Sequence, residues 1–231
     1  MSFEKTLLSA GIALTALAAP IFSDAFSPAQ AGEEKTGFYG VLSVGVMNLD
    51  DPDWDTTVSS TAYGGSADLD SDETAYELGI GYDFGNWRTD LTYSVSEHDL
   101  DSCTETKQSA ACATGGQGSG DMKTFMANVY YDIETESKFT PYLGAGIGTT
   151  EISPDNIKVA GTEYDLKSED TTTYQLKAGV SYEVSEKVDL LGEATYRKYD
   201  DIKTSTDVAN VEFNVDEISA WSFLFGARYR F

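Results

Sequence analysis

The chain has 231 residues, a formal charge of −24 and 12% aromatic residues. This charge argues against binding to nucleic acid, whose phosphates attract lysine and arginine. The aromatic content argues against an acidic disordered chain, and the length accommodates one ordinary domain.

The N-terminal segment has the features of an export signal. Lys5 precedes an apolar run from Leu7 to Ala19, and a polar stretch then ends in Ala29-Gln30-Ala31, a small-residue cleavage pattern. A run of this length is too short for a helix that crosses a bilayer, which needs about 20 apolar residues. We expect residues 1–31 to be a cleaved signal peptide and residues 32–231 to be the exported domain.

Alternation with a period of two indicates β-strands in that domain. From Tyr76 to Phe84, apolar side chains alternate with glycines and acids, and residues 87–96 and 174–184 show a similar alternation of apolar with polar or small residues. Weaker candidates bring the total to eight: 38–47, 124–133, 141–149, 188–196 and 221–231. Each has about the 9–11 residues that a tilted strand needs to cross a membrane. We predict an all-β, eight-stranded antiparallel up-and-down transmembrane β-barrel.

The connections between these strands alternate in length. Short turns follow the second, fourth and sixth strands at residues 85–86, 134–139 and 185–187, and long loops occupy residues 49–72, 99–121, 153–171 and 200–214. An even-stranded barrel with both termini in the periplasm requires this pattern and places four long loops outside the cell. A water-soluble barrel with the opposite sidedness stays open, because alternation alone does not say which face points outward.

Aromatic residues gather at two depths, as expected for the two membrane interfaces. One group flanks the short turns and the C-terminus, and the other lies toward the long loops: Phe84, Trp87, Tyr182, Tyr229 and Phe231, and Tyr76, Tyr93, Phe125, Tyr174, Tyr196 and Trp221.

Charged residues occupy the face opposite the apolar one, which we expect to point inward. Because unpaired buried charge is costly and the bore of such a barrel is narrow, we expect an ion-pair network that fills the lumen. A gated ion path is the alternative. The predicted network consists of Glu77, Asp83, Arg88, Asp90, Lys177, Glu183, Asp189, Glu193, Arg197, Arg228 and Arg230.

The two cysteines, Cys103 and Cys112, lie close together in one long loop. In an exported chain we expect a structural disulfide between them. Alternate glycines at Gly144, Gly146 and Gly148 do not have the spacing of a nucleotide-binding loop. We expect them to make room for bulky side chains across the lumen.

The sequence has a single histidine, His98, near the loop end of the third strand. No nucleophile motif accompanies it, so we expect a solvated rim residue and a chain that is not an enzyme. A barrel enzyme using His98 is the alternative.

The long loops together hold 20 acidic and four basic residues. The order of the acids does not match a calcium-binding EF-hand loop, and we expect neither a specific metal site nor a cofactor. Diffuse attraction of divalent cations, which would bridge to lipopolysaccharide phosphates, is the expected role of this charge.

Two segments carry a family resemblance. The last strand ends on Phe231 with Phe223, Phe225 and Tyr229 at alternate positions, and it resembles the C-terminal signal that the barrel-assembly machinery of Gram-negative bacteria recognises. The segment from Thr140 to Gly148 resembles the fifth strand of opacity-type surface proteins and of OmpA-type membrane domains. The resemblance implies a location in the bacterial outer membrane, with its lipid and the assembly machinery as partners.

These observations favour a structural or surface-interaction barrel with acidic extracellular loops. No sequence motif indicates which ligand the loops bind. We expect a monomer that binds no nucleic acid. A small, porin-like ion-conducting pore is the alternative function.

Overall fold

The computed structural model describes residues 36–51, 53–58, 61–69, 73–107, 118–154, 157–159, 162–164, 168–205 and 212–231. This part of the chain contains β-strands joined by turns, and none of its segments is a helix long and apolar enough to span a bilayer.

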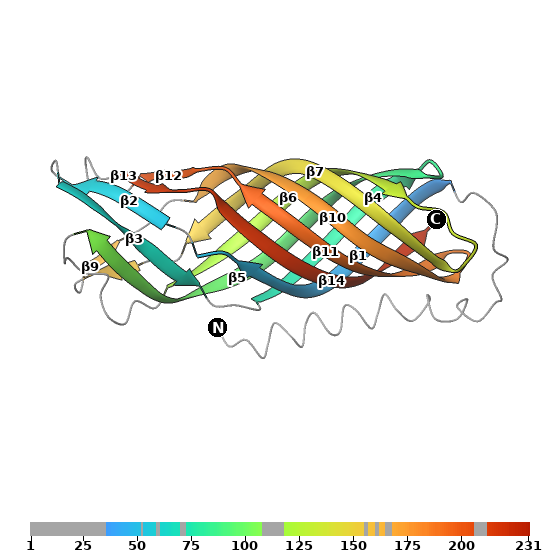
Figure 1. Cartoon of the computed structure of the whole chain (residues 1–231), viewed down its shortest axis with the longest axis horizontal. Coiled ribbons are helices and arrows are strands. Elements are labelled where there is room, and N and C mark those ends of the chain that lie inside the picture. Colours follow the sequence, from blue (N-terminus) through green and yellow to red (C-terminus); the bar gives the residue numbers. More distant parts are fainter. Residues whose placement is uncertain are drawn as a thin grey trace.

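Eight long strands form a closed antiparallel barrel (Figure 1). Each pairs with the next long strand along the chain, and the last pairs with the first, which confirms the predicted fold class. The strands are β1 (Gly37–Leu49), β4 (Glu73–Asp83), β5 (Trp87–Lys107), β6 (Gly118–Asp132), β7 (Phe139–Pro154), β10 (Glu169–Ser185), β11 (Val188–Tyr199) and β14 (Ile218–Arg230).

The short turns lie at the end of the barrel where the chain ends, and the long connections lie at the opposite end (Figure 1). In the turn between β4 and β5, Gly85 adopts a φ of 103° and donates its N–H to the Asp83 carboxylate at 3.0 Å. A positive φ of this size favours glycine, which explains the residue at this position.

The long connections contain further strands, which the sequence did not indicate. In the first, β2 (Asp53–Val58) pairs with β3 (Thr61–Leu69), and β3 pairs with the distal part of β5. In the fourth, β12 (Ile202–Ser205) pairs with β13 (Glu212–Val215), and β13 pairs with β2. The third contains β8 (Ile157–Val159) and β9 (Thr162–Tyr164), which form a separate sheet.

The predicted strand lengths were therefore wrong at the loop end of the barrel. β5 has 21 residues and β10 has 17, whereas the sequence predicted about ten for each. Where a strand extends past a membrane, neither of its faces has to be apolar. Strands can therefore continue to pair through polar residues, without the alternation that marks a lipid-facing strand.

The exposure of the side chains confirms that the apolar face points outward. Leu78 and Ile80 are 54% and 62% exposed, whereas Glu77 between the strand's apolar residues is 4% exposed. Exposed aromatics lie near both ends of this outer face, among them Phe84 and Trp87 at one and Tyr93, Phe125 and Trp221 at the other. A water-soluble barrel would show the reverse arrangement.

The alternate glycines of β7 make room for an adjacent strand, and the prediction that they accommodate residues across the lumen was wrong. Gly144 lies opposite Tyr130 of β6, and Gly146 lies opposite Asn128. A Cβ atom on Gly144 would lie 2.5 Å from the Tyr130 ring. Directly paired side chains on one face of a sheet are close neighbours, so a bulky one selects a small partner.

Candidate functional site: the barrel lumen

The end of the lumen beside the short turns holds two groups of ion pairs. Arg88 binds Asp132 through Nε and Nη2 at 2.6 and 2.9 Å. The Asp189 carboxylate binds both Arg228 and Arg230, with N···O distances of 2.7 and 2.6 Å. Each of these five charged groups contacts an opposite charge, which lowers the cost of burying it. Asp83, buried at the same end, accepts the Gly85 N–H instead.

Arg88 also stacks against aromatic rings. Its guanidinium carbon lies 4.6 Å from the ring centroid of Tyr130 and 4.9 Å from that of Tyr142. The two rings pack edge to face, with their centroids 5.9 Å apart. These rings fill the space between the ion pairs at the short-turn end and the middle of the barrel.

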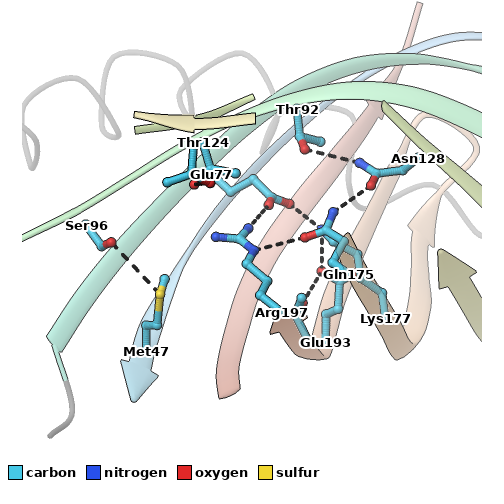
Figure 2. Close-up of polar contacts among 12 residues, drawn as sticks. Met47, Glu77, Thr92, Ser96, Thr124, Asn128, Gln175, Lys177, Glu193 and Arg197 are labelled. Atoms are coloured by element: carbon cyan, nitrogen blue, oxygen red, sulfur yellow. Dashed lines mark hydrogen bonds and ion pairs between the residues drawn. The ribbon is translucent and has the colours of Figure 1, made fainter. Parts of the chain in front are cut away.

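The middle of the lumen holds a network centred on Lys177 (Figure 2). Lys177 Nζ lies 2.7 Å from Glu77 and 2.9 Å from Glu193, and Arg197 binds the second Glu77 oxygen at 3.1 Å. Glu77 belongs to β4 and Lys177 to β10, which is four strands away in a barrel of eight. The pair therefore crosses the full width of the lumen.

Amides extend this network toward β5 and β6 (Figure 2). Arg197 Nε donates to Gln175 Oε1 at 2.9 Å, and Gln175 Nε2 donates to Asn128 Oδ1 at 2.5 Å. Asn128 Nδ2 in turn donates to Asp90 at 2.8 Å and to Thr92 at 3.1 Å. The donors and acceptors thus form one connected chain across the barrel.

Most of the predicted interior residues are buried in the lumen. Eight are at most 7% exposed: Glu77, Asp83, Arg88, Asp90, Lys177, Asp189, Arg197 and Arg228. Glu193 and Arg230 are half-buried, with side chains 10% and 17% exposed. Glu183 is half-buried beside an irregularity in the pairing of β10 with β11.

Several residues of the lumen were missing from the sequence prediction. They are Tyr39, Asn128, Tyr130, Asp132, Tyr142 and Gln175. The alternation of β6 could have assigned Asn128 and Asp132 to the inner face, because both fall on its polar positions. The same alternation assigns Tyr130 to the inner face, between Asn128 and Asp132, and Tyr142 to the glycine face of β7. Residue type alone would not have found these tyrosines, since tyrosines also populate the outer belts.

One small cavity lies between the two polar layers. Its lining includes residues of both layers: Tyr39, Arg88, Asp90, Glu193 and Arg228. The space open to water centres is about 20 Å³, which suits about one ordered water. Such a cavity is too small for a continuous aqueous path.

Hydroxyl groups and then apolar side chains fill the lumen toward the long loops. Thr150 Oγ1 lies 2.9 Å from Thr124 Oγ1 and 2.6 Å from Thr173 Oγ1. From this row outward, with Leu224 reaching back to pair with Glu193, lies a packed group. We term it the upper apolar cluster: Met47, Ala75, Met122, Tyr199, Ile218, Ala220 and Leu224.

His98 faces this end of the lumen and is 6% exposed, so the prediction of a solvated rim residue was wrong. Its Nε2 lies 2.9 Å from Ser96 Oγ, and its Nδ1 has no hydrogen-bond partner within the described residues. The outward-facing Glu97 beside it is exposed and charged, which places His98 beyond the apolar band. Burial lowers the pKa of His98 to about 4, so its imidazole is neutral at pH 7.

Other predicted features are only partly visible. Residues 1–31 and Cys112 lie outside the described residues, as does the side chain of Cys103, so the signal peptide and the disulfide stay predictions. Phe223, Phe225 and Phe231 are exposed on the outer face, and Tyr229 is half-buried. Their exposure does not test a role in assembly, which stays a prediction.

Comparison with known proteins identifies a matching family and several partial relatives. A family model described as "Outer membrane protein beta-barrel domain" matches residues 14–231. Outer membrane protein W of Vibrio cholerae is 28% identical over 111 residues, which cover 47% of this chain and 51% of that protein. An uncharacterized protein of Brucella abortus is 28% identical over 136 residues, which cover 50% of this chain and 48% of that protein.

The chain thus spans about half the length of the curated relatives it matches. Among solved structures, the outer membrane protein OprG of Pseudomonas aeruginosa superimposes with a TM-score of 0.58 at 18% identity. That match covers 86% of this chain and 97% of OprG. At this level of identity the likeness shows the fold alone.

Proposed function

The chain belongs to the outer membrane protein β-barrel family of bacteria, and on this premise we propose that it acts as a closed barrel that presents a contact surface outside the cell. The observation that carries the proposal is the filled lumen. Ion pairs, aromatic rings, hydroxyl groups and the upper apolar cluster follow one another along its length. A permeating ion would have to separate buried charge pairs, each held at hydrogen-bond distance.

The proposed contact surface is the sheet beyond the barrel rim. β3 and β2 continue from β5, and β13 and β12 continue from β2, so the first and fourth connections share one sheet (Figure 1). A sheet of this kind supplies a more rigid surface than separate loops would, because its backbone groups are paired. Rigid surfaces lose less conformational entropy when they bind a partner.

Acidic residues give this end of the molecule its charge. Glu97 and Asp121 are directly paired, face outward and are exposed beyond the apolar band. Like charges in this position repel each other unless cations screen them. Lipopolysaccharide, with divalent cations as bridges, is therefore the partner that we propose for the membrane-proximal part of this surface. We also propose that the signal peptide is cleaved on export and that a Cys103–Cys112 disulfide forms in the second long connection.

We do not assign an enzymatic activity to His98. A serine–histidine pair needs a third group that orients the imidazole and an accessible nucleophile. Ser96 and His98 are both more than 90% buried, and Nδ1 of His98 has no such partner among the described residues. These features support a barrel without catalytic function.

Planar-bilayer recordings of the refolded protein test the closed lumen. We expect a baseline without discrete openings across both voltage polarities, and a porin added afterwards to the same bilayer should conduct normally. Steady single-channel openings by the refolded protein would instead support the pore.

Limited proteolysis of intact cells tests where the contact surface lies. Added protease should cut within residues 50–72 and 200–217 and should spare the turn between Ile133 and Phe139. After the cells are opened, the turn becomes accessible from the periplasm. Cleavage of this turn in intact cells would reverse the topology and refute the proposed surface.

A further inference from the structure

His98 forms a hydrogen bond through one ring nitrogen and not through the other. Its Nε2 lies 2.9 Å from Ser96 Oγ, and the same oxygen lies 3.9 Å from Met47 Sδ (Figure 2). Its Nδ1, on the side of the ring away from Ser96, is buried and has no hydrogen-bond partner in the described part of the chain. A neutral imidazole tolerates this arrangement, because one of its two nitrogens carries no proton.

A protonated His98 would not fit the same place. Both nitrogens of an imidazolium are donors, so a second N–H would be buried without an acceptor. The ring would also carry a charge one hydroxyl group away from Met47 of the upper apolar cluster. A buried charge or donor without a partner costs free energy. This cost favours any arrangement that takes the imidazolium into water.

The surrounding strands offer little charge to offset this cost. On the inner face of the barrel strands at this end, the titratable residues within the described structure besides His98 are Glu73 of β4, Glu169 of β10 and Tyr199 of β11. Acids past the strand ends, such as Asp51 and Asp216, are exposed to solvent. Burial is the cause that lowers the pKa of His98 to about 4, and no carboxylate offsets it.

We propose that His98 is a pH-sensitive switch for the outer end of the lumen. In the closed state its neutral ring is bonded to Ser96 and covers this end of the upper apolar cluster. When the ring gains a proton, it leaves Ser96 and turns into the outer medium, which is near because His98 lies beyond the apolar band. Water then reaches Ser96 and Met47, while the ion pairs below keep the lumen closed to ions.

Acid should favour the open state. The closed state holds His98 at a pKa of about 4, whereas a ring in water has the ordinary pKa of 6.5, so the open state binds the proton more tightly. The closed state is therefore fully stable above pH 6.5 and loses stability as the pH falls towards 4. These two values predict that the open population rises about 30-fold between pH 7.5 and pH 5. Carboxylates of ordinary pKa are still mostly ionised at pH 5.

Alkylation of the methionines by iodoacetamide, read by peptide mass spectrometry, measures this opening in the refolded protein. Thioethers do not titrate in this range, so their intrinsic reactivity is the same at pH 7.5 and pH 5. We expect Met47 to react about 30-fold faster at pH 5. Met126 is the internal control, because it is equally buried but is paired with Thr92, deeper in the lumen. It should stay protected at both pH values.

His98→Gln is the matched variant, because glutamine stays neutral and its amide can still bond to Ser96. Met47 should then react at one slow rate at both pH values, and the shift on unheated gels checks that the barrel is folded. A faster reaction in acid by this variant would overturn the proposal, since another group would be responsible. An unchanged Met47 rate in the parent would also overturn it, as would an equal rise at Met126, which would mean that the whole barrel opens.

Proton NMR of the ring provides a second readout, because the chain has a single histidine. In protein prepared without a histidine tag, the ring signal should titrate at a pKa well below 6.5. A titration at the ordinary value would contradict the buried closed state and overturn the switch.

Discussion

Lys177 Nζ lies 2.7 Å from Glu77 Oε1, although the two residues are 100 positions apart in the chain and on opposite walls of the barrel. The same ammonium group binds Glu193 at 2.9 Å. One lysine thus connects three strands across the lumen, and its removal should lower the stability of the whole barrel.

Lys177→Met should destabilise the barrel strongly. The substitution keeps most of the side-chain volume but leaves Glu77 and Glu193 buried without their shared cation, a loss that costs about 3–5 kcal/mol in other proteins. Urea unfolding in detergent micelles or lipid vesicles measures the change. Lys198→Met is the control, because Lys198 binds Glu217 at 2.6 Å on the surface, where both side chains are about half exposed. We expect no measurable change there, and equal effects of the two variants would contradict the importance of the network.

An arginine on the outer face should be costly only at the depth of the hydrocarbon. Ile80 lies midway in sequence between the aromatic residues Tyr76 and Phe84 and is 62% exposed on the outer face. Ile80→Arg should cost about 2–4 kcal/mol in lipid vesicles. Thr74→Arg, on the same strand and face but beyond Tyr76, should cost at most about 1 kcal/mol. If Thr74→Arg lowered the free energy of unfolding as much as Ile80→Arg, the hydrocarbon would have to extend past Tyr76.

A methyl group at Gly144 should disturb the packing of the lumen. The new Cβ would lie 2.5 Å from the Tyr130 ring, which is itself fixed against Arg88. Overpacking of this kind costs about 1–3 kcal/mol. In Gly192→Ala the nearest atom to the new Cβ, in Phe225, would be 3.7 Å away, so that variant should unfold at the parent's urea concentration or above. If Gly144→Ala were as stable as Gly192→Ala, the fit between β6 and β7 would have to be looser than the structure shows.

Phe231→Asp should lower the yield of folded protein in the outer membrane if the last strand is the assembly signal. Quantitative blotting of unheated samples measures the folded fraction. Phe84→Asp is a suitable control, because Phe84 is also an exposed aromatic at the short-turn end, at 60% against 78% for Phe231. A similar loss in both variants would mean that the aromatic belt, and not a terminal signal, determines the yield.

Sequence patterns identified the membrane-crossing strands well, and the reason is physical. Between Tyr76 and Phe84 every second residue must be compatible with lipid, so burial and exposure alternate with the period of the strand. The same requirement identified Lys177 and Glu77 as inward-facing. It could not identify which charges meet, because contacts across the lumen depend on the stagger between strands that are distant in the chain.

The strands outside the membrane were not predictable in this way. Residues 101–107 of β5 are almost entirely polar, and their partner in the described structure is β3, which precedes them by about 35 residues. His98 was misplaced for a related reason. Ser96 and His98 continue the inward positions of β5 past the last apolar outward residue, where the alternation no longer marks the strand.

The pairing of β3 with β5 and of β13 with β2 determines how this surface can be engineered. A peptide inserted between β2 and β3, or between β12 and β13, would strain backbone pairing shared by connections that are distant in sequence. β8 and β9 pair only with each other in the described structure. For display of a foreign epitope on the cell, the β8–β9 hairpin is therefore the insertion point that leaves the other connections undisturbed.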